Sequence, residues 1–184
     1  MLAHWIAARD IPSGGTTYIL DNADIWLAPA AEFGMQLRMR EPLCAMIFVL
    51  PRENGFLVRG SLRGSVFVPC SRCTEESTID IKQDFESFEP FPGTFEKGED
   101  DPAALDSMRD ESVVRISVCG PEIDLSALAW QELVLALPVK PLCNPECKGL
   151  CARCGANLNQ GSCACVQEDG DPRLAALRGL HVHR

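Results

Sequence analysis

Apolar and polar residues alternate along much of the first half of the chain, which is the period of β-strands that bury one face. The stretch "MQLRMR" places Met35, Leu37 and Met39 on one side and predicts a half-buried strand. The next stretch, "LCAMIFVLPRENGFLVRG", contains Asn54-Gly55, a dipeptide typical of type I′ turns because both central residues need positive φ. These patterns predict a β-hairpin that turns at Asn54-Gly55.

Beyond this turn the alternation continues on both sides of the motif "PCSRC". The apolar residues before the motif share one parity: Phe56, Val58, Leu62, Val66 and Val68. Gly60 and Gly64 lie between them, which indicates long or bulged strands. After the motif, "ESTIDIKQDF" alternates again. We therefore expect Cys70 and Cys73 at or near the tip of a second hairpin.

One further strand and one helix are predicted later in the chain. The stretch "SVVRISV" reads as a strand, and Asp124 is a good N-cap for a helix over about residues 124–137, which Pro138 would end. Two apolar stripes run along this helix, so it is either central to the core or shared with a partner.

The net charge of −9 is concentrated in one segment. Ten acidic residues against two basic ones lie between Asp84 and Glu111, and the rest of the chain is nearly neutral. Proline, glycine and acidic residues without a sustained period predict a loop over about residues 90–112. This loop is either a solvating insertion or an acidic surface that docks a basic partner such as a ribosomal protein.

The number of cysteines and the expected cellular compartment indicate that the cysteines bind metal. The N-terminus lacks the apolar region of a secretory signal, and the longest apolar run has eight residues, so we expect no export, no membrane span and a cytoplasmic location. Ten cysteines in a reducing compartment are more often metal ligands than disulfides.

Spacing divides eight of the cysteines into two sets of four, and the sequence therefore predicts two zinc ions. CxxC is the spacing at which a tight turn lets two thiolates converge on one ion. The first predicted set is local and the second joins the C-terminal tail to the hairpin. The sets are Cys151, Cys154, Cys163 and Cys165, and Cys70, Cys73, Cys143 and Cys147.

A different grouping would form one centre from Cys143, Cys147, Cys151 and Cys154 and leave the other two pairs without partners. Cys44 and Cys119 lie alone in strand-like stretches, where we expect small buried side chains.

The predicted fold class is α+β: a mainly antiparallel β-sheet or partial barrel with a long helix and a C-terminal zinc-knuckle segment. Residues 1–138 form the β-rich domain. Residues 139–184 form a cysteine-rich zinc-binding tail that packs on the hairpin and ends in a short helix, for which Asp171 is a candidate cap.

The cysteine motifs resemble the YceD-type large ribosomal RNA subunit accumulation proteins. The similarity lies in "PCSRCTE", in "LALPVKPLCNPECKGLCARCGANLNQGSCAC" and in "DPRLAALRGL", and it spans roughly residues 41–180. The resemblance implies a bacterial cytoplasmic protein with a role in accumulating large-subunit ribosomal RNA, hence in ribosome biogenesis. It implies no enzymatic activity, and the family's cysteine pattern carries over onto all eight proposed ligands. Thr74 and Ala152 depart from the usual family residues, but neither is a ligand.

The expected partner is therefore a large ribosomal subunit precursor, contacted through ribosomal protein or rRNA. Strand arginines offer a modest basic surface for this contact: Arg38, Arg40, Arg59, Arg63 and Arg115. A scaffold or regulatory zinc protein unrelated to ribosomes is the alternative. A thiol oxidoreductase is less favoured, because reactive CxxC pairs open a helix whereas "PCSRCTEESTIDI" reads as strand, turn and strand. No nucleotide-binding or HExxH motif is present, so we expect no enzyme.

Overall fold

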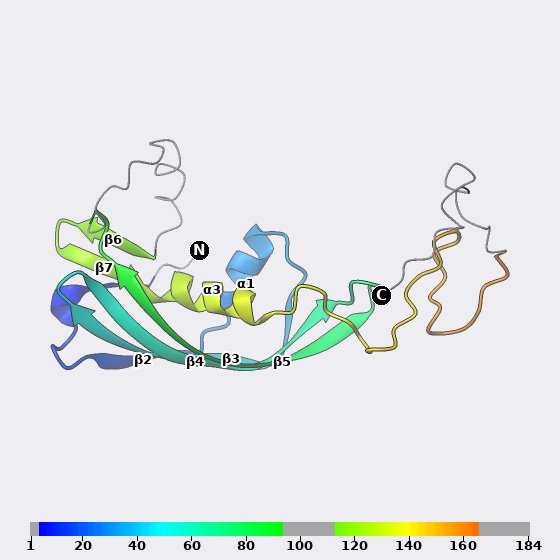
Figure 1. Cartoon of the computed structure of the whole chain (residues 1–184), viewed down its shortest axis with the longest axis horizontal. Coiled ribbons are helices and arrows are strands. Elements are labelled where there is room, and N and C mark those ends of the chain that lie inside the picture. Colours follow the sequence, from blue (N-terminus) through cyan, green and yellow to red (C-terminus); the bar gives the residue numbers. More distant parts are fainter. Residues whose placement is uncertain (1–3, 94–112, 166–184) are drawn as a thin grey trace, which may run out of the picture.

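The computed structural model describes residues 4–93 and 113–165 of the 184-residue chain. Two antiparallel sheets and two α-helices make up this part (Figure 1). The predicted α+β class with a mainly antiparallel sheet is therefore confirmed. Within these residues no helix has the length and apolar character needed to cross a membrane.

Three long strands dominate the larger sheet, in which the order is β2-β3-β4-β5. The smaller sheet has the order β1-β7-β6. In chain order the elements are β1 (Trp5–Ala7), the 3-10 turn η1 (Ala8–Asp10), β2 (Thr16–Leu20), α1 (Asp24–Glu32), β3 (Arg38–Arg52), β4 (Gly55–Pro69), β5 (Glu76–Pro90), β6 (Val114–Ser117), β7 (Gly120–Asp124) and α3 (Leu125–Ala136).

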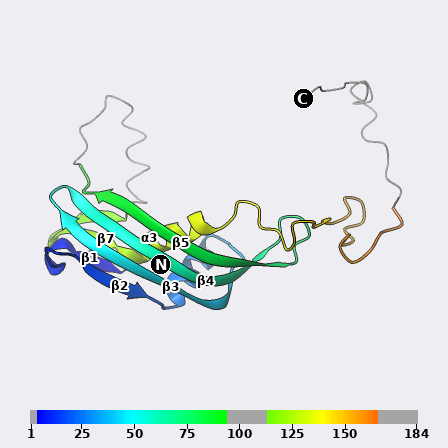
Figure 2. The same ribbon diagram turned by 60° about the horizontal axis from the view of Figure 1, so that its bottom comes forward.

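Both helices lie on one side of the four-stranded sheet, and the core fills the space between them (Figures 1 and 2). The parity predicted for β4 is confirmed, because Phe56, Val58, Leu62 and Val66 are fully buried beneath the helices. Trp26 of α1 and Leu133 of α3 complete this core from the helical side. The opposite face of the sheet carries the charged side chains of the strands.

The first hairpin forms, but its predicted turn geometry is wrong. Arg52 pairs with Gly55, so the loop residues are Glu53 and Asn54. Within the described ranges Thr74 alone among non-glycine residues has a positive φ, so no type I′ turn is centred on Asn54-Gly55. Gly55 instead serves close packing, since a Cβ atom there would lie 2.5 Å from the carbonyl oxygen of Glu89 on β5.

The strand predicted from Met35 starts later, at Arg38. Residues before it continue the end of α1, because the backbone N–H of Met35 donates to the Ala30 carbonyl over 2.7 Å. Gly34 takes a left-handed φ of 64° there, as is common after a helix C-terminus. Local hydrogen bonding at the helix end thus overrides the alternating pattern.

The predicted helix N-cap is confirmed. The Asp124 side chain accepts hydrogen bonds from the backbone N–H groups of Ser126 and Ala127, at 2.9 Å and 3.2 Å. The helix has only 12 residues, so the expectation of a long helix is not confirmed. Pro138 follows two residues after its end, where a helix cannot continue.

The two isolated cysteines are less buried than the sequence predicts. Cys119 lies exposed in the turn between β6 and β7 rather than buried in a strand, because Ser117 pairs directly with Gly120. Cys44 is half-buried. Most of the predicted acidic loop and the short terminal helix fall outside the described residues.

Candidate metal centres

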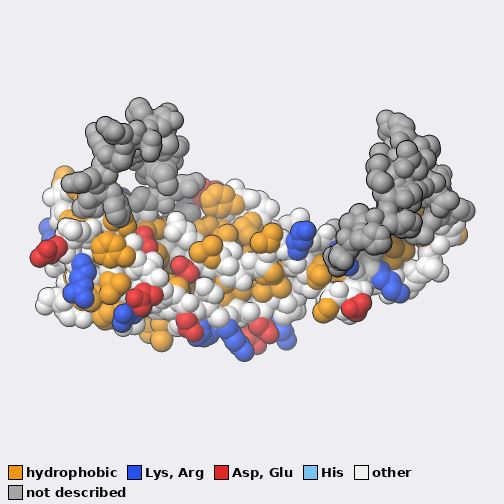
Figure 3. All heavy atoms as spheres, in the orientation of Figure 1, with side chains coloured by type: hydrophobic (Ala, Val, Ile, Leu, Met, Phe, Trp, Pro, Cys, Tyr) orange, Lys and Arg blue, Asp and Glu red, His pale blue; other side chains and the backbone are white. Residues whose placement is uncertain are grey.

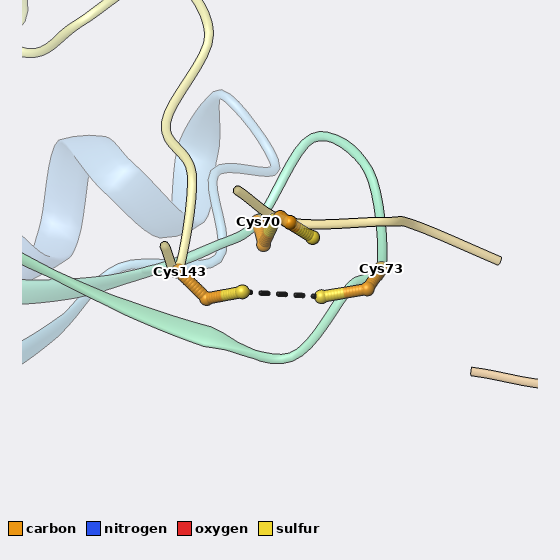
Figure 4. A group of neighbouring side chains, drawn as sticks. Cys70, Cys73 and Cys143 are labelled. Carbon is orange, nitrogen blue, oxygen red and sulfur yellow. Dashed lines mark hydrogen bonds between the residues drawn. The ribbon is translucent and has the colours of Figure 1, made fainter. Parts of the chain in front are cut away.

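The first cluster, which we call the hairpin site, consists of Cys70, Cys73, Cys143 and Cys147. Cys70 and Cys73 lie in the turn between β4 and β5, and the other two come from the segment after α3. Figure 4 shows the side chains of Cys73 and Cys143 pointing toward each other. The Sγ atoms of Cys73 and Cys143 are 3.4 Å apart, and those of Cys70 and Cys147 are 3.8 Å apart. Cys70, Cys73 and Cys147 are almost fully buried.

A tight turn aims the first two sulfurs at one point. The backbone N–H of Cys70 donates to the Glu75 carbonyl over 2.8 Å, and that of Thr74 donates to the Cys70 carbonyl over 3.0 Å. Thr74 adopts a φ of 62°, in the left-handed region that closes such a turn. The hairpin tip predicted for this CxxC is confirmed.

Hydrogen bonds bring the later segment to the tip. The backbone N–H of Ser71 donates to the Pro141 carbonyl over 2.8 Å, and the Ser77 hydroxyl donates to the Leu142 carbonyl over 2.7 Å. The Arg72 guanidinium donates to the Cys147 carbonyl over 2.7 Å. These contacts place Cys143 and Cys147 opposite Cys70 and Cys73.

The second cluster, which we call the tail site, consists of Cys151, Cys154, Cys163 and Cys165. A turn closes its CxxC, since the backbone N–H of Gly155 donates to the Cys151 carbonyl over 2.9 Å. The N–H of Cys151 in turn donates to the Ala156 carbonyl over 2.8 Å. The tail site is less buried than the hairpin site.

The geometry of both clusters is that of a four-thiolate metal site. In each one the four Sγ atoms lie within 4.8 Å of one another. A tetrahedron with Zn–S bonds of about 2.3 Å has edges of about 3.8 Å, close to the sulfur separations in the hairpin site. Each cluster can therefore hold one metal ion. The eight cysteines meet in the two sets that the spacing predicts, and the single centre of Cys143, Cys147, Cys151 and Cys154 is not formed.

The thiols of each cluster differ in pKa because some receive hydrogen bonds from backbone N–H groups, whereas others lie beside a neighbouring thiol. Burial raises the pKa of Cys70, but N–H donors from Cys143, Arg72 and Cys73 outweigh it and lower that pKa to about 6. The Cys73 thiol beside it raises the pKa of Cys143 to about 12.

The tail site shows the same contrast. Backbone N–H groups of Cys154 and Arg153 lower the pKa of Cys151 to about 6. Contact with the Cys154 thiol raises the pKa of Cys165 to about 12. Four thiols this close cannot all ionise together unless a cation balances them, which suits a divalent metal.

One residue near the hairpin site escaped the sequence analysis. The Asn159 side chain, from the loop between Cys154 and Cys163, donates from Nδ2 to the Cys147 sulfur over 3.3 Å. This hydrogen bond is the main reason that the Cys147 pKa is lowered. The loop sequence "GANLNQGS" contains glycine, asparagine and serine, which are typical of turns, and nothing in it indicates a contact with the other site.

The five candidate arginines do not form one free basic surface. Arg115 lies on β6 of the smaller sheet and the other four on the larger sheet. Each guanidinium pairs with a carboxylate of another strand in its own sheet. The pairs are Arg38–Glu76, Arg40–Asp80 at 3.9 Å, Arg59–Glu86 at 2.7 Å, Arg63–Asp84 at 2.5 Å and Arg115–Glu122 at 2.7 Å.

Four of the five carboxylates belong to β5. Arg59 lies directly opposite Glu86, whereas Arg38 and Arg40 reach across β4 from β3. Figure 3 shows basic and acidic side chains interspersed along the lower edge of the molecule, where the outer face of the sheet lies. The first part of the acidic segment is thus strand, and its Asp84 and Glu86 are neutralised by arginines.

Comparison with known proteins identifies relatives of this chain. The profile of the family "Large ribosomal RNA subunit accumulation protein YceD" matches residues 58–181. A chloroplastic YCED homolog 1 of Zea mays is 29% identical over 176 residues, which cover 86% of this chain and 60% of the maize protein. The corresponding Arabidopsis thaliana protein is 28% identical over 155 residues, covering 76% of this chain and 48% of that protein.

An uncharacterised protein of Mycobacterium tuberculosis is 28% identical over 125 residues, covering 68% of this chain and 55% of that protein. The chain thus spans about half the length of the curated relatives it matches. No solved structure matches it significantly. The family profile covers both cysteine clusters and most of the long hairpin that carries Cys70 and Cys73. The chain therefore belongs to the YceD family of large ribosomal RNA subunit accumulation proteins.

Proposed function

We propose that this chain is a non-enzymatic, zinc-stabilised binding protein that supports the accumulation of large-subunit ribosomal RNA during ribosome biogenesis. The observation that carries the proposal is the pair of four-cysteine clusters within the part of the chain matched by the family profile. Ten free cysteines suit a reducing compartment, and we place the protein in the bacterial cytoplasm. The two plant relatives are named chloroplastic.

Zinc is the metal that we assign to both sites. Four thiolates in a tetrahedron are typical of structural zinc, which leaves no coordination position for substrate or water. The metal would hold the tail to the hairpin and contribute to folding there. Elemental analysis of the purified protein tests this assignment: we expect two zinc ions per chain, and one or none in fully reduced protein would refute it.

The alternative function is that of a thiol oxidoreductase, because the pKa of the Cys70 thiol is lowered and a thiolate is the reactive form in thiol exchange. A reactive thiol must meet a disulfide of another molecule, and such thiols are partly exposed. Cys70 is only 1% exposed and lies in a turn between two strands. Its lowered pKa therefore favours metal binding over thiol exchange.

We propose that the partner is a precursor of the large ribosomal subunit, contacted through a basic ribosomal protein. The paired arginines favour this route over direct binding to RNA phosphate, because their positive charge is already balanced by carboxylates. The acidic segment offers a complementary charge for a basic protein.

Density-gradient sedimentation of cell extracts tests the proposal. We expect the intact protein with precursor large subunits and little on translating ribosomes. Deletion of residues 94–110 should abolish this association, whereas the matched variant Arg59→Ala with Arg63→Ala should retain it. The reverse pattern would favour direct RNA contact. Absence of the intact protein from every precursor fraction would refute the assembly role.

A further inference from the structure

The loop of the tail site contacts a ligand of the hairpin site. Asn159 lies on the loop between Cys154 and Cys163, and its Nδ2 donates to the Cys147 sulfur over 3.3 Å. Cys147 is 1% exposed, so water has little access to this sulfur. A hydrogen bond from an amide to a metal-binding thiolate stabilises its negative charge and fixes its direction.

The carboxamide of Asn159 is held on both sides. Its Oδ1 accepts from the backbone N–H of Lys148 over 2.7 Å, and its Nδ2 also donates to Asn157 Oδ1 over 2.9 Å. The same Asn157 oxygen accepts from the Asn159 backbone N–H over 3.0 Å. The side chain is therefore oriented by its own loop and by the residue that follows Cys147.

Backbone contacts tie the loop to the short connection between the two sites. The N–H of Leu158 donates to the Gly149 carbonyl over 2.9 Å, and Leu150 and Asn157 form an antiparallel bridge. The N–H of Leu150 also donates to the Arg72 carbonyl over 3.2 Å, at the tip of the hairpin. Hairpin tip, connection and loop thus form one continuous set of hydrogen bonds.

From this arrangement we propose that Asn159 is a positioning residue that couples the two metal sites. Metal at the tail site fixes both ends of the loop, at Cys154 and Cys163, and so holds Asn159 against Cys147. The hairpin site then binds its metal more tightly. Because such coupling is reciprocal, a filled hairpin site tightens the tail site by the same factor. The inference rests on the proposed zinc occupancy.

The test compares zinc affinities in a chelator competition with the full chain. Asn159→Asp keeps the oxygen that accepts from Lys148 but loses the donor to Cys147. We expect it to weaken zinc binding at the hairpin site by about 10- to 100-fold, as is typical when a partner of a metal ligand is lost. Gln160→Ala, at the exposed next position on the loop, is the matched control and should change nothing.

A second background isolates the coupling. Cys154→Ser with Cys163→Ser empties the tail site, and the hairpin site should weaken by a factor similar to that of Asn159→Asp. Adding Asn159→Asp in this background should then have little further effect, because the loop no longer holds the side chain in place. Asn159→Ala, which removes the whole carboxamide, serves as a second variant and should behave in the same way.

Each other result has a distinct meaning. Unchanged hairpin-site affinity in both Asn159 variants would overturn the positioning role. An equal effect of Asn159→Asp in both backgrounds would overturn the coupling, since Asn159 would then act without the tail site. A wild-type chain that binds no zinc would instead overturn the proposed metal centres.

Discussion

Removing one cysteine from each site should have very different consequences. Cys73→Ser should empty the hairpin site and detach the segment after α3 from the sheet. Cys151→Ser should empty only the tail site. The difference arises because Cys73 belongs to the hairpin and binds across to Cys143, whereas all four tail-site cysteines belong to one local segment.

The magnitude follows from the contacts that hold the segment. Besides the contacts between cysteine sulfurs, at least five hydrogen bonds join it to the hairpin, and each contributes about 1 kcal/mol net. Ordering this segment costs conformational entropy that opposes these hydrogen bonds, so on their own they hold it only weakly. A four-thiolate zinc site contributes on the order of 10 kcal/mol, so its loss should release the segment.

Hydrogen exchange measured by mass spectrometry, with zinc analysis, tests this reasoning. In Cys73→Ser, residues 139–165 should exchange rapidly while the sheet stays protected, since its core does not include these cysteines. In Cys151→Ser, rapid exchange should be confined to residues 151–165. Cys119→Ser, in an exposed turn, is the control. The same exchange pattern in both site variants would refute the claim that the hairpin site tethers the segment.

Three further predictions concern acidity, packing and capping. The lowered pKa of Cys151 favours its thiolate, the form that binds metal, and zinc binding displaces the protons of the other tail-site thiols, so the zinc measured after dialysis should be retained near neutral pH and decrease as the pH falls; a zinc content that does not change with pH would contradict this. Gly55→Ala should lower the free energy of unfolding in urea by about 1–3 kcal/mol, because its Cβ would meet the Glu89 carbonyl; an unchanged midpoint would mean that β5 shifts freely. Asp124→Ala should lower the thermal stability by about 1–2 kcal/mol, and Asp124→Asn, which keeps an accepting oxygen, should restore most of it; equal losses would assign the effect to charge rather than capping.

Regular patterns along the sequence predicted the parts of the fold that depend on local chemistry. Alternation placed Val58 and Leu62 in the core, and Asp124 marked the start of α3. The spacing of the cysteines predicted both four-cysteine sets, because CxxC pairs can complete a site only with complementary pairs.

Features set by tertiary contacts were missed. The elements before Gly34, including α1, carry no clear period in the sequence, although Trp26 is among the most buried residues. The arginines on the strands form a basic pattern in the sequence, but the folded sheet brings β5 carboxylates to Arg59 and Arg63 that the linear sequence does not place beside them. The contact of Asn159 with Cys147 likewise depends on how the two sites stack.

The length of β5 sets a fixed separation within the molecule. The strand begins at Glu76, beside the hairpin site, and ends at Pro90, within the acidic segment (Figure 1). Its 15 residues rise about 3.3 Å each, so these two regions are held about 50 Å apart by a backbone paired along its whole length. The sheet therefore keeps the distance between these two regions constant. A partner that touched both ends would have to span about 50 Å, and two individually weak contacts at that spacing would reinforce each other through a high effective concentration.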